Sequence, residues 1–183
     1  MRTLVITQNM TLDGSIEMLD DWFDPQLQDD DLLAESRRQD SRADALLLGR
    51  RTFEDFRSYW PHQATDQTGI TDYLNQVTKY VVSSTMTEPD WVNSTVLQGD
   101  PIEAVHELKS LPGRDIVVTG SITLTHALVT AGLVDEYRFF VYPTVQGRGR
   151  TVGPHGLVVP RLELAGRPKM FRSGIVLLRY RPA

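Results

Sequence analysis

The sequence predicts a single α/β domain over residues 1–183, with a mostly parallel mixed sheet, flanking helices and a C-terminal antiparallel hairpin. Apolar runs of strand length alternate with helical segments of about ten residues, which is the pattern of βαβ crossovers. The last two apolar runs follow each other without a helix between them, so we expect them to pair as a hairpin. A chain of 183 residues is long enough for one ordinary domain with a sizeable core.

The N-terminal part begins with an apolar run at residues 2–8, which predicts a strand. Residues 9–28 are polar and contain turn-forming residues, so they predict a long loop. The acidic run at 29–31 favours the start of a helix that continues to about Gln39, because carboxylates stabilise a helix N-terminus.

The middle of the chain continues the alternation. The buried-type run at 43–48 predicts a strand, and residues 50–59 predict a short helix that stops before Pro61. Residues 79–84 predict another strand, and a shorter one is expected at 95–97.

The clearest helix start lies at Asp100, a good N-cap, followed by Pro101 at the first helical position. Pro112 and Gly113 end this helix. The elements expected after it are a strand at 115–119, a helix at 122–131 that Gly132 terminates, a strand at 136–142, a Gly-rich loop at 143–160, and hairpin strands at 161–171 and 174–180 that turn at Arg172 and Ser173.

Composition excludes several classes of protein. The net charge of −5 argues against general nucleic-acid binding, which needs clustered Lys and Arg. The absence of Cys excludes disulfides and Cys-ligated metals, and the four His residues lack metal-site spacing, so no metal site is expected. No apolar run approaches the roughly 18 residues of a membrane span, and no signal peptide is visible, so we expect a soluble cytoplasmic protein.

Three strand exits carry residues suited to binding anions. Gly49, Arg50, Arg51 and Thr52 open a helix directly after a strand, where cations oppose the helix dipole unless an anion is bound. Two solvated arginines on a surface turn are the alternative. The other exits carry Ser83 and Ser84 after the strand at 79–84, and Thr119, Gly120 and Ser121 after the strand at 115–119.

Each of these two further exits also has a plainer interpretation, as a polar loop start or a tight turn. Because carboxyl ends of parallel strands meet at one edge of a sheet, three anion-friendly exits together favour one extended phosphorylated ligand. A glycine such as Gly120 would let the backbone approach that ligand closely.

Several acidic and basic loops are further candidates. Asp13 precedes Gly14 in the first loop, where it could form a simple turn or place a carboxylate over a pocket. Among Asp29–Asp31, one carboxylate, with Asp31 preferred, could orient or protonate a substrate, although a solvated helix start is the alternative. The loop at 147–150 could contact an anionic substrate or be a flexible surface loop.

Five segments in order, TLDG, LLLGRRTFEDF, YVVSST, VVTGSITLTHAL and GLVDEYRFFVYPTVQGRG, resemble the dihydrofolate reductase-like superfamily, and specifically its riboflavin-biosynthesis reductase C-terminal domain group. The resemblance covers nearly all of residues 2–180. It implies an eight-stranded mixed sheet with flanking helices, an NADPH site, reduction of a small-molecule substrate, and a homodimer. The aromatic strand at 137–142 could pack across the two-fold axis of that dimer.

Residue by residue, the resemblance implies the following cofactor contacts. Gly49, Arg50, Arg51 and Thr52 match the segment that holds the adenosine-side phosphates, and Ser83 and Ser84 match serines near the ribose 2′-phosphate. Thr119, Gly120, Ser121 and Ile122 match the turn beneath the pyrophosphate and nicotinamide, and Gln8 and Asn9 match first-strand positions beside the nicotinamide amide.

Two departures from the classical folate enzymes disfavour folate as the substrate. The pattern Trp-x-x-Pro-x-acid begins at Trp22 but has Leu27 in place of the acid, and the basic residue expected before the serine pair aligns with Val77. The leading hypothesis is therefore an NADPH-dependent reductase of a small heterocyclic or carbonyl substrate, with 5-amino-6-(5-phosphoribosylamino)uracil reduction as the first reaction to test. A dihydrofolate reductase and a non-catalytic NADPH-binding module are the alternatives.

Overall fold

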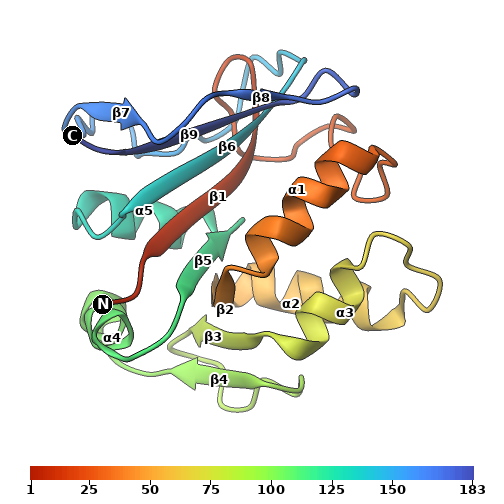
Figure 1. Cartoon of the computed structure of the whole chain (residues 1–183). Coiled ribbons are helices and arrows are strands. Elements are labelled where there is room, and N and C mark those ends of the chain that lie inside the picture. Colours follow the sequence, from red (N-terminus) through yellow and green to blue (C-terminus); the bar gives the residue numbers. More distant parts are fainter.

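The computed structural model describes residues 1–183, and its strands form one sheet with helices on both faces (Figure 1). The nine strands have the order β4-β3-β2-β5-β1-β6-β9-β7, with β8 paired to β9. The strands from β4 to β6 pair in parallel, and β9 runs antiparallel to β6. The strands are β1 (Leu4–Thr11), β2 (Ala43–Gly49), β3 (Thr78–Val82), β4 (Ser94–Leu97), β5 (Asp115–Thr119), β6 (Glu136–Tyr142), β7 (Leu162–Leu164), β8 (Lys169–Met170) and β9 (Val176–Pro182).

The helices cover the sheet because each parallel connection must cross one of its faces. In Figure 1, α4 and α5 lie on one side of the sheet, and α1, α2 and α3 lie on the other. The helices are α1 (Asp30–Asp40), α2 (Arg50–Tyr59), α3 (Ile70–Gln76), α4 (Pro101–Ser110) and α5 (Ile122–Thr130), with a short 3₁₀ turn at Trp60–His62.

The two faces of the sheet bury separate apolar cores. Leu4 and Ile6 of β1 pack with Val105 of α4 and Leu128 of α5 in the larger core. Phe53 of α2 belongs to the core on the other face. Since successive side chains of a strand point to opposite faces, the buried strands β2 and β5 contribute to both cores.

The helix caps follow the sequence. The Asp100 carboxylate accepts hydrogen bonds from the amides of Ile102 and Glu103, at 2.7 and 3.1 Å, and so caps α4. Gly132 follows α5 with a φ of +66°, as expected of a glycine that ends a helix.

Three local expectations were wrong. Strand β1 continues to Thr11 instead of ending at residue 8, because polar residues at its end still pair with β6. A helix, α3, occupies a stretch for which no element was expected. The segment at 161–171 is interrupted between β7 and β8, so the sheet has nine strands where the family resemblance implied eight.

None of the helices has the length and apolar character that crossing a membrane would require.

Candidate functional site

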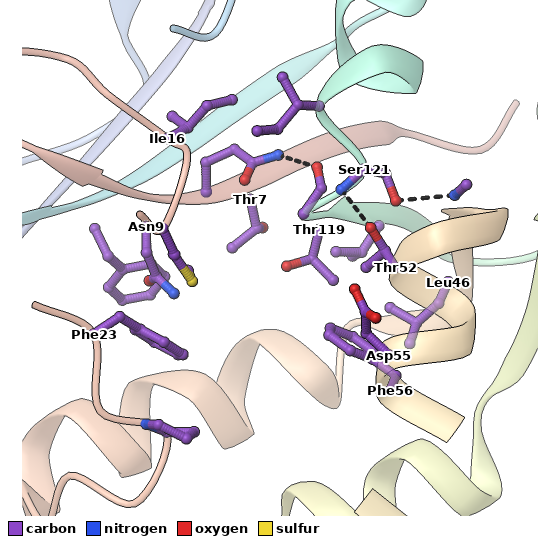
Figure 2. A pocket seen from close by; sticks show the side chains of 18 of the residues that line it. Thr7, Asn9, Ile16, Phe23, Leu46, Thr52, Asp55, Phe56, Thr119 and Ser121 are labelled. Carbon is purple, nitrogen blue, oxygen red and sulfur yellow. Dashed lines mark hydrogen bonds between the residues drawn. The ribbon is translucent and has the colours of Figure 1, made fainter. Parts of the chain in front are cut away.

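A cavity of about 1120 Å³ opens between the sheet and helices α1 and α2. Figure 2 shows Phe23 and Asn9 facing Asp55 and Phe56 from opposite sides of this cavity, with Thr7 nearby on β1. Its volume exceeds that of a single small-molecule pocket, which is typically about 300–1,000 Å³. The predicted residues among its lining are Gln8, Asn9, Gly49, Arg50, Arg51, Thr52, Thr119, Gly120, Ser121 and Ile122.

The starts of α2 and α5 are joined by side-chain hydrogen bonds at one end of the cavity. The Gly49 amide donates to Ser121 Oγ at 2.9 Å, and the Ser121 amide donates to Thr52 Oγ1 at 2.9 Å. Figure 2 shows both bonds. We call this set of residues, Gly49, Thr52, Gly120 and Ser121, the clasp. It places two helix N-termini next to each other.

The backbone of the clasp requires left-handed conformations. Gly120 has a φ of +58°, and the following Ser121 has a φ of +46°, which is uncommon for a residue with a side chain. Buried Gln8 supports the turn, because its Nε2 donates to the Gly120 carbonyl at 2.7 Å. The turn therefore presents its amides in a fixed geometry, and a Cβ on Gly120 would lie 2.9 Å from Thr52 Cγ2.

Helix N-termini suit anions because the first amides of a helix have no partner within it. Here α2 and α5 have no side-chain cap on those amides, whereas the α4 start is capped by Asp100. Arg51 adds positive charge at the start of α2, and Arg50 lies beside it, where it also forms an ion pair with Glu54 at 3.1 Å. The arrangement fits a ligand that carries a pyrophosphate.

A second cavity of about 430 Å³ adjoins the first at Arg50, which lines both. The Ser83 hydroxyl oxygen accepts from the amides of Thr85 and Met86, so this side chain shapes the turn after β3. Ser84 and Thr85 also line the cavity. The guanidinium and these hydroxyls are the groups that a separate phosphate would need.

Asp13 lies outside the main cavity. Its carboxylate accepts hydrogen bonds from the Thr11 hydroxyl at 2.5 Å and from the amides of Gln146 and Gly147. These bonds, the Thr11 bond foremost, lower the pKa of Asp13 to about 2. A carboxyl that stays ionised and joins two loops is suited to a structural role and poorly suited to proton donation.

Asp31 also does not line the cavity; its side chain is exposed in the first turn of α1. Its neighbour Asp29 is the N-cap of α1 and accepts from the amides of Leu32 and Ser173. None of the three carboxylates of this acidic run lines the cavity.

Sequence reasoning missed the acids that do line the cavity. Asp55, one turn after Thr52 on α2, faces the open space in Figure 2. Asp40, the last residue of α1, also lines it, and burial raises the pKa of this carboxyl to about 7 although Arg138 opposes the shift. The helical spacing of Thr52 and Asp55 could have indicated the first; only the packing of α1 on the sheet indicates the second.

The loop at 147–150 contributes one residue to the cavity. Arg150 lines it and forms an ion pair with Glu17 at 2.5 Å, whose pKa the arginine lowers. Arg148 instead pairs with Asp20. Both arginines are thus already matched by carboxylates, which weakens the case for a strong anion site at this loop.

The two departures from the folate enzymes occupy different places. Leu27 lines the cavity, where it presents an apolar side chain. Val77 is buried in the core beneath α2 and α3 and does not reach the cavity.

The sheet order and the cavity at the carboxyl ends of its strands define a dihydrofolate reductase-like domain. The sequence matches the RibD C-terminal domain family over residues 2–174, and the chain therefore belongs to that family. The uncharacterized protein YyaP of Bacillus subtilis (strain 168) is 31% identical over 188 residues, covering 98% of this chain and 94% of the relative.

Solved structures share the fold at low identity. A protein from Shewanella sp. PV-4 with a provisional riboflavin-biosynthesis name has a TM-score of 0.71 at 18% identity, covering 99% of each chain. A pyrimidine reductase-like protein from Corynebacterium diphtheriae has a TM-score of 0.66 at 16% identity, with 98% of this chain and 91% of that chain covered. A diaminohydroxyphosphoribosylaminopyrimidine deaminase/5-amino-6-(5-phosphoribosylamino)uracil reductase from Thermotoga maritima has a TM-score of 0.67 at 17% identity, covering 100% of this chain and 57% of that one.

Proposed function

We propose that the protein is an NADPH-dependent reductase of a small heterocyclic or carbonyl substrate. The observation that carries the proposal is the position of Arg50 between two cavities. One cavity is bounded by helix N-termini and is large, and the other is small and bounded by the hydroxyls of Ser83 and Ser84. A dinucleotide with a 2′-phosphate has matching parts, a pyrophosphate and a separate phosphate.

Different residues of the chain would bind different parts of this cofactor. The clasp and the start of α2 would hold the pyrophosphate, and Arg50 with the serines would hold the 2′-phosphate. Bound NADPH supplies a hydride. The protein's part is to orient the substrate beside Thr7 and Asn9, to exclude water, and to provide a proton through a group such as Asp55.

The substrate class is supported by relatives in the same fold. The neighbours from Corynebacterium diphtheriae and Thermotoga maritima are described as a pyrimidine reductase-like protein and an aminouracil reductase. We therefore propose 5-amino-6-(5-phosphoribosylamino)uracil, or a heterocycle like it, as the first substrate to test. Leu27 in the cavity wall argues against folate, which the classical enzymes contact through an acid at that position.

Catalysis is distinguished from mere cofactor binding by hydride transfer. We expect the absorbance of the reduced nicotinamide of NADPH to fall when the aminouracil substrate is added to the protein. Asp55→Asn should lower the rate while leaving the NADPH dissociation constant unchanged. Binding of NADPH without turnover of any small heterocycle would favour the non-catalytic alternative.

The choice of cofactor gives a direct test. We expect NADPH to bind about tenfold or more tightly than NADH, because a charge-assisted hydrogen bond to the 2′-phosphate contributes about 1.5–3 kcal/mol. Calorimetry at fixed salt measures both dissociation constants. Arg50→Gln should weaken NADPH binding and leave NADH binding nearly unchanged. Equal affinity of the wild-type protein for the two cofactors would contradict the assignment of the second cavity.

We also propose that the protein is a homodimer, on the strength of the family resemblance. The aromatic strand cannot be the reason, because β6 lies between β1 and β9 and its Tyr137 and Phe140 are buried within the chain. The exposed apolar side chains of Leu164 on edge strand β7 and Met170 on β8 are better candidates for an interface. Light scattering should give twice the 20.7 kDa chain mass. A species of 20.7 kDa alone at micromolar concentration would rule the dimer out.

A further inference from the structure

The main cavity has two ends of different chemistry. One end lies at the clasp and the start of α2, which supply backbone amides and arginines. The other end lies at α1 and the loop before it, and we call it the α1 end. In Figure 2, Phe23 of the α1 end lies across the open space from Thr52 of the clasp. Apolar and aromatic side chains that pack as one cluster line this end, namely Phe23, Leu27, Leu32, Phe140 and Tyr142.

The charged groups that face the α1 end are carboxylates. Asp24 is exposed in the loop and lines the cavity, and its charge adds to burial in raising the pKa of Tyr142 to about 12. Asp40 lines the cavity from the last turn of α1, and Asp55 faces the open space from α2 (Figure 2). No lysine and no histidine lines the cavity. Only an arginine could therefore balance these negative charges.

Arg138 of β6 is the arginine beside the α1 end, and its charge is already matched within the chain. It is 1% exposed, its Nε donates to Glu136 at 2.8 Å, and its Nη2 donates to Asp115 at 2.9 Å. Its remaining nitrogen, Nη1, is buried, so a molecule in the cavity does not reach it. Arg138 thus offers no free positive charge to a ligand.

The other three arginines of the cavity lining are associated with the opposite end. Arg50 and Arg51 are the first two residues of α2. Arg150 pairs with Glu17 at 2.5 Å, and its hydrogen bonds, with the charge of Arg51 adding to them, lower the pKa of Glu17. The Glu17 carboxylate therefore offsets part of the charge of these arginines. In the proposed function, the phosphates of the cofactor take the positive charge that is left.

We infer that the α1 end takes the ring of a substrate that carries no phosphate or other anionic group, such as a nucleoside or a free heterocyclic base. This inference rests on the proposed function, and it narrows the substrate from the phosphoribosyl compound to its unphosphorylated counterpart. A phosphate at the α1 end would exchange water for a site with three carboxylates and no free cation, which is unfavourable. Aromatic contacts and the neutral polar groups of Asn9 and Ser36 suit an uncharged ring.

The test compares 5-amino-6-(ribosylamino)uracil with 5-amino-6-(5-phosphoribosylamino)uracil on protein saturated with NADP⁺. The pH is about 8, where the Asp40 carboxyl is ionised. Calorimetry should give a dissociation constant at least about tenfold lower for the unphosphorylated compound, because like charges repel strongly at a site shielded from water. Equal or tighter binding of the phosphorylated compound would overturn the inference, and so would failure of both compounds to bind.

A double variant tests whether the carboxylates cause the preference. Asp24→Asn with Asp40→Asn should lower the ratio of the two dissociation constants by at least about threefold. Asp21→Asn with Asp30→Asn is the matched control, because it removes two exposed carboxylates from the same loop and helix, outside the cavity lining. The control should keep the wild-type ratio. Partial unfolding of a variant would weaken both apparent affinities equally and leave the ratio unaltered. An unchanged ratio in the first variant, or an equal decrease in the control, would contradict the inference.

Cofactor binding is measured by calorimetry on the same protein. If NADPH binds and the phosphorylated compound is preferred, the inference fails and the proposed function stands. If neither NADPH nor NADP⁺ binds, the proposed function fails. The effect of Asp24→Asn with Asp40→Asn on the ratio, measured on the protein alone, then still decides whether the carboxylates exclude a phosphate.

Discussion

Gly120→Ala should lower the free energy of unfolding by about 2–4 kcal/mol. This figure is the sum of the cost of a left-handed backbone angle for alanine and the cost of a steric clash. The φ of Gly120 is +58°, and a Cβ there would lie 2.9 Å from Thr52 Cγ2. The clash would also separate the starts of α2 and α5. We therefore expect NADPH affinity to fall together with stability, measured by thermal or urea unfolding and by calorimetry.

Gly132→Ala is the matched control for this substitution. Gly132 has a similar φ of +66°, but nothing lies within 4 Å of its would-be Cβ. Gly132→Ala should therefore lower the free energy of unfolding only by the cost of the left-handed backbone angle, about 1–2 kcal/mol. Adding Thr52→Ser to Gly120→Ala removes the clashing methyl group and keeps the hydroxyl that accepts from Ser121. The clash is not the cause of the lost stability if the two glycine variants are equally stable. The same conclusion follows if adding Thr52→Ser to Gly120→Ala restores no stability.

Asp40 should make the protein lose stability as the pH rises from about 4 to about 7. Burial raises the pKa of this carboxyl from 3.8 to about 7, so between these values the native state binds a proton that the unfolded state releases. The destabilising contribution is absent at lower pH and reaches its full size above pH 7. A shift of this size corresponds to a destabilisation on the order of 3 kcal/mol.

Asp40→Asn removes the titration and isolates the effect from the other carboxyls, which include Asp13 and Glu35 with pKa values lowered to about 2. Urea unfolding of both proteins at several pH values should show the variant gaining stability over the wild type as the pH rises. A difference that is independent of pH would contradict the prediction, as would an equal pH-dependent gain in Asp30→Asn.

The sequence was sufficient to predict the parallel part of the sheet and its crossover helices. Buried runs such as 43–48 and 115–119 are bounded by turn residues, and the Asp100 cap is a local feature that tertiary packing does not alter. The end of β1 was misjudged because Gln8 and Asn9 are polar. Both residues line the cavity, so this end of the strand resembles a loop in sequence.

The acids of the site could not be predicted in the same way. Asp13 and Asp31 stand next to recognisable turn and helix-start patterns, and local hydrogen bonding or solvent exposure accounts for them. Asp40 ends a helix in an ordinary polar sequence. Its pKa depends on burial against the sheet and on the charge of Arg138, nearly one hundred residues away, and no spacing along the chain reveals either. The strand exits that line the cavities were easier to predict, because glycine and hydroxyl residues at strand ends are local features.

The clasp has a consequence for how the protein folds. Its bonds join Gly49 with Ser121 and Thr52 with Ser121 across 72 and 69 residues, and Gln8 reaches Gly120 across 112 residues. Contacts of such long range form late, since chain closure must precede them. A cofactor that recognises the clasp would therefore find nothing to bind in a partly folded chain. It would prolong the life of the native state by slowing unfolding, and the rate of folding would stay the same.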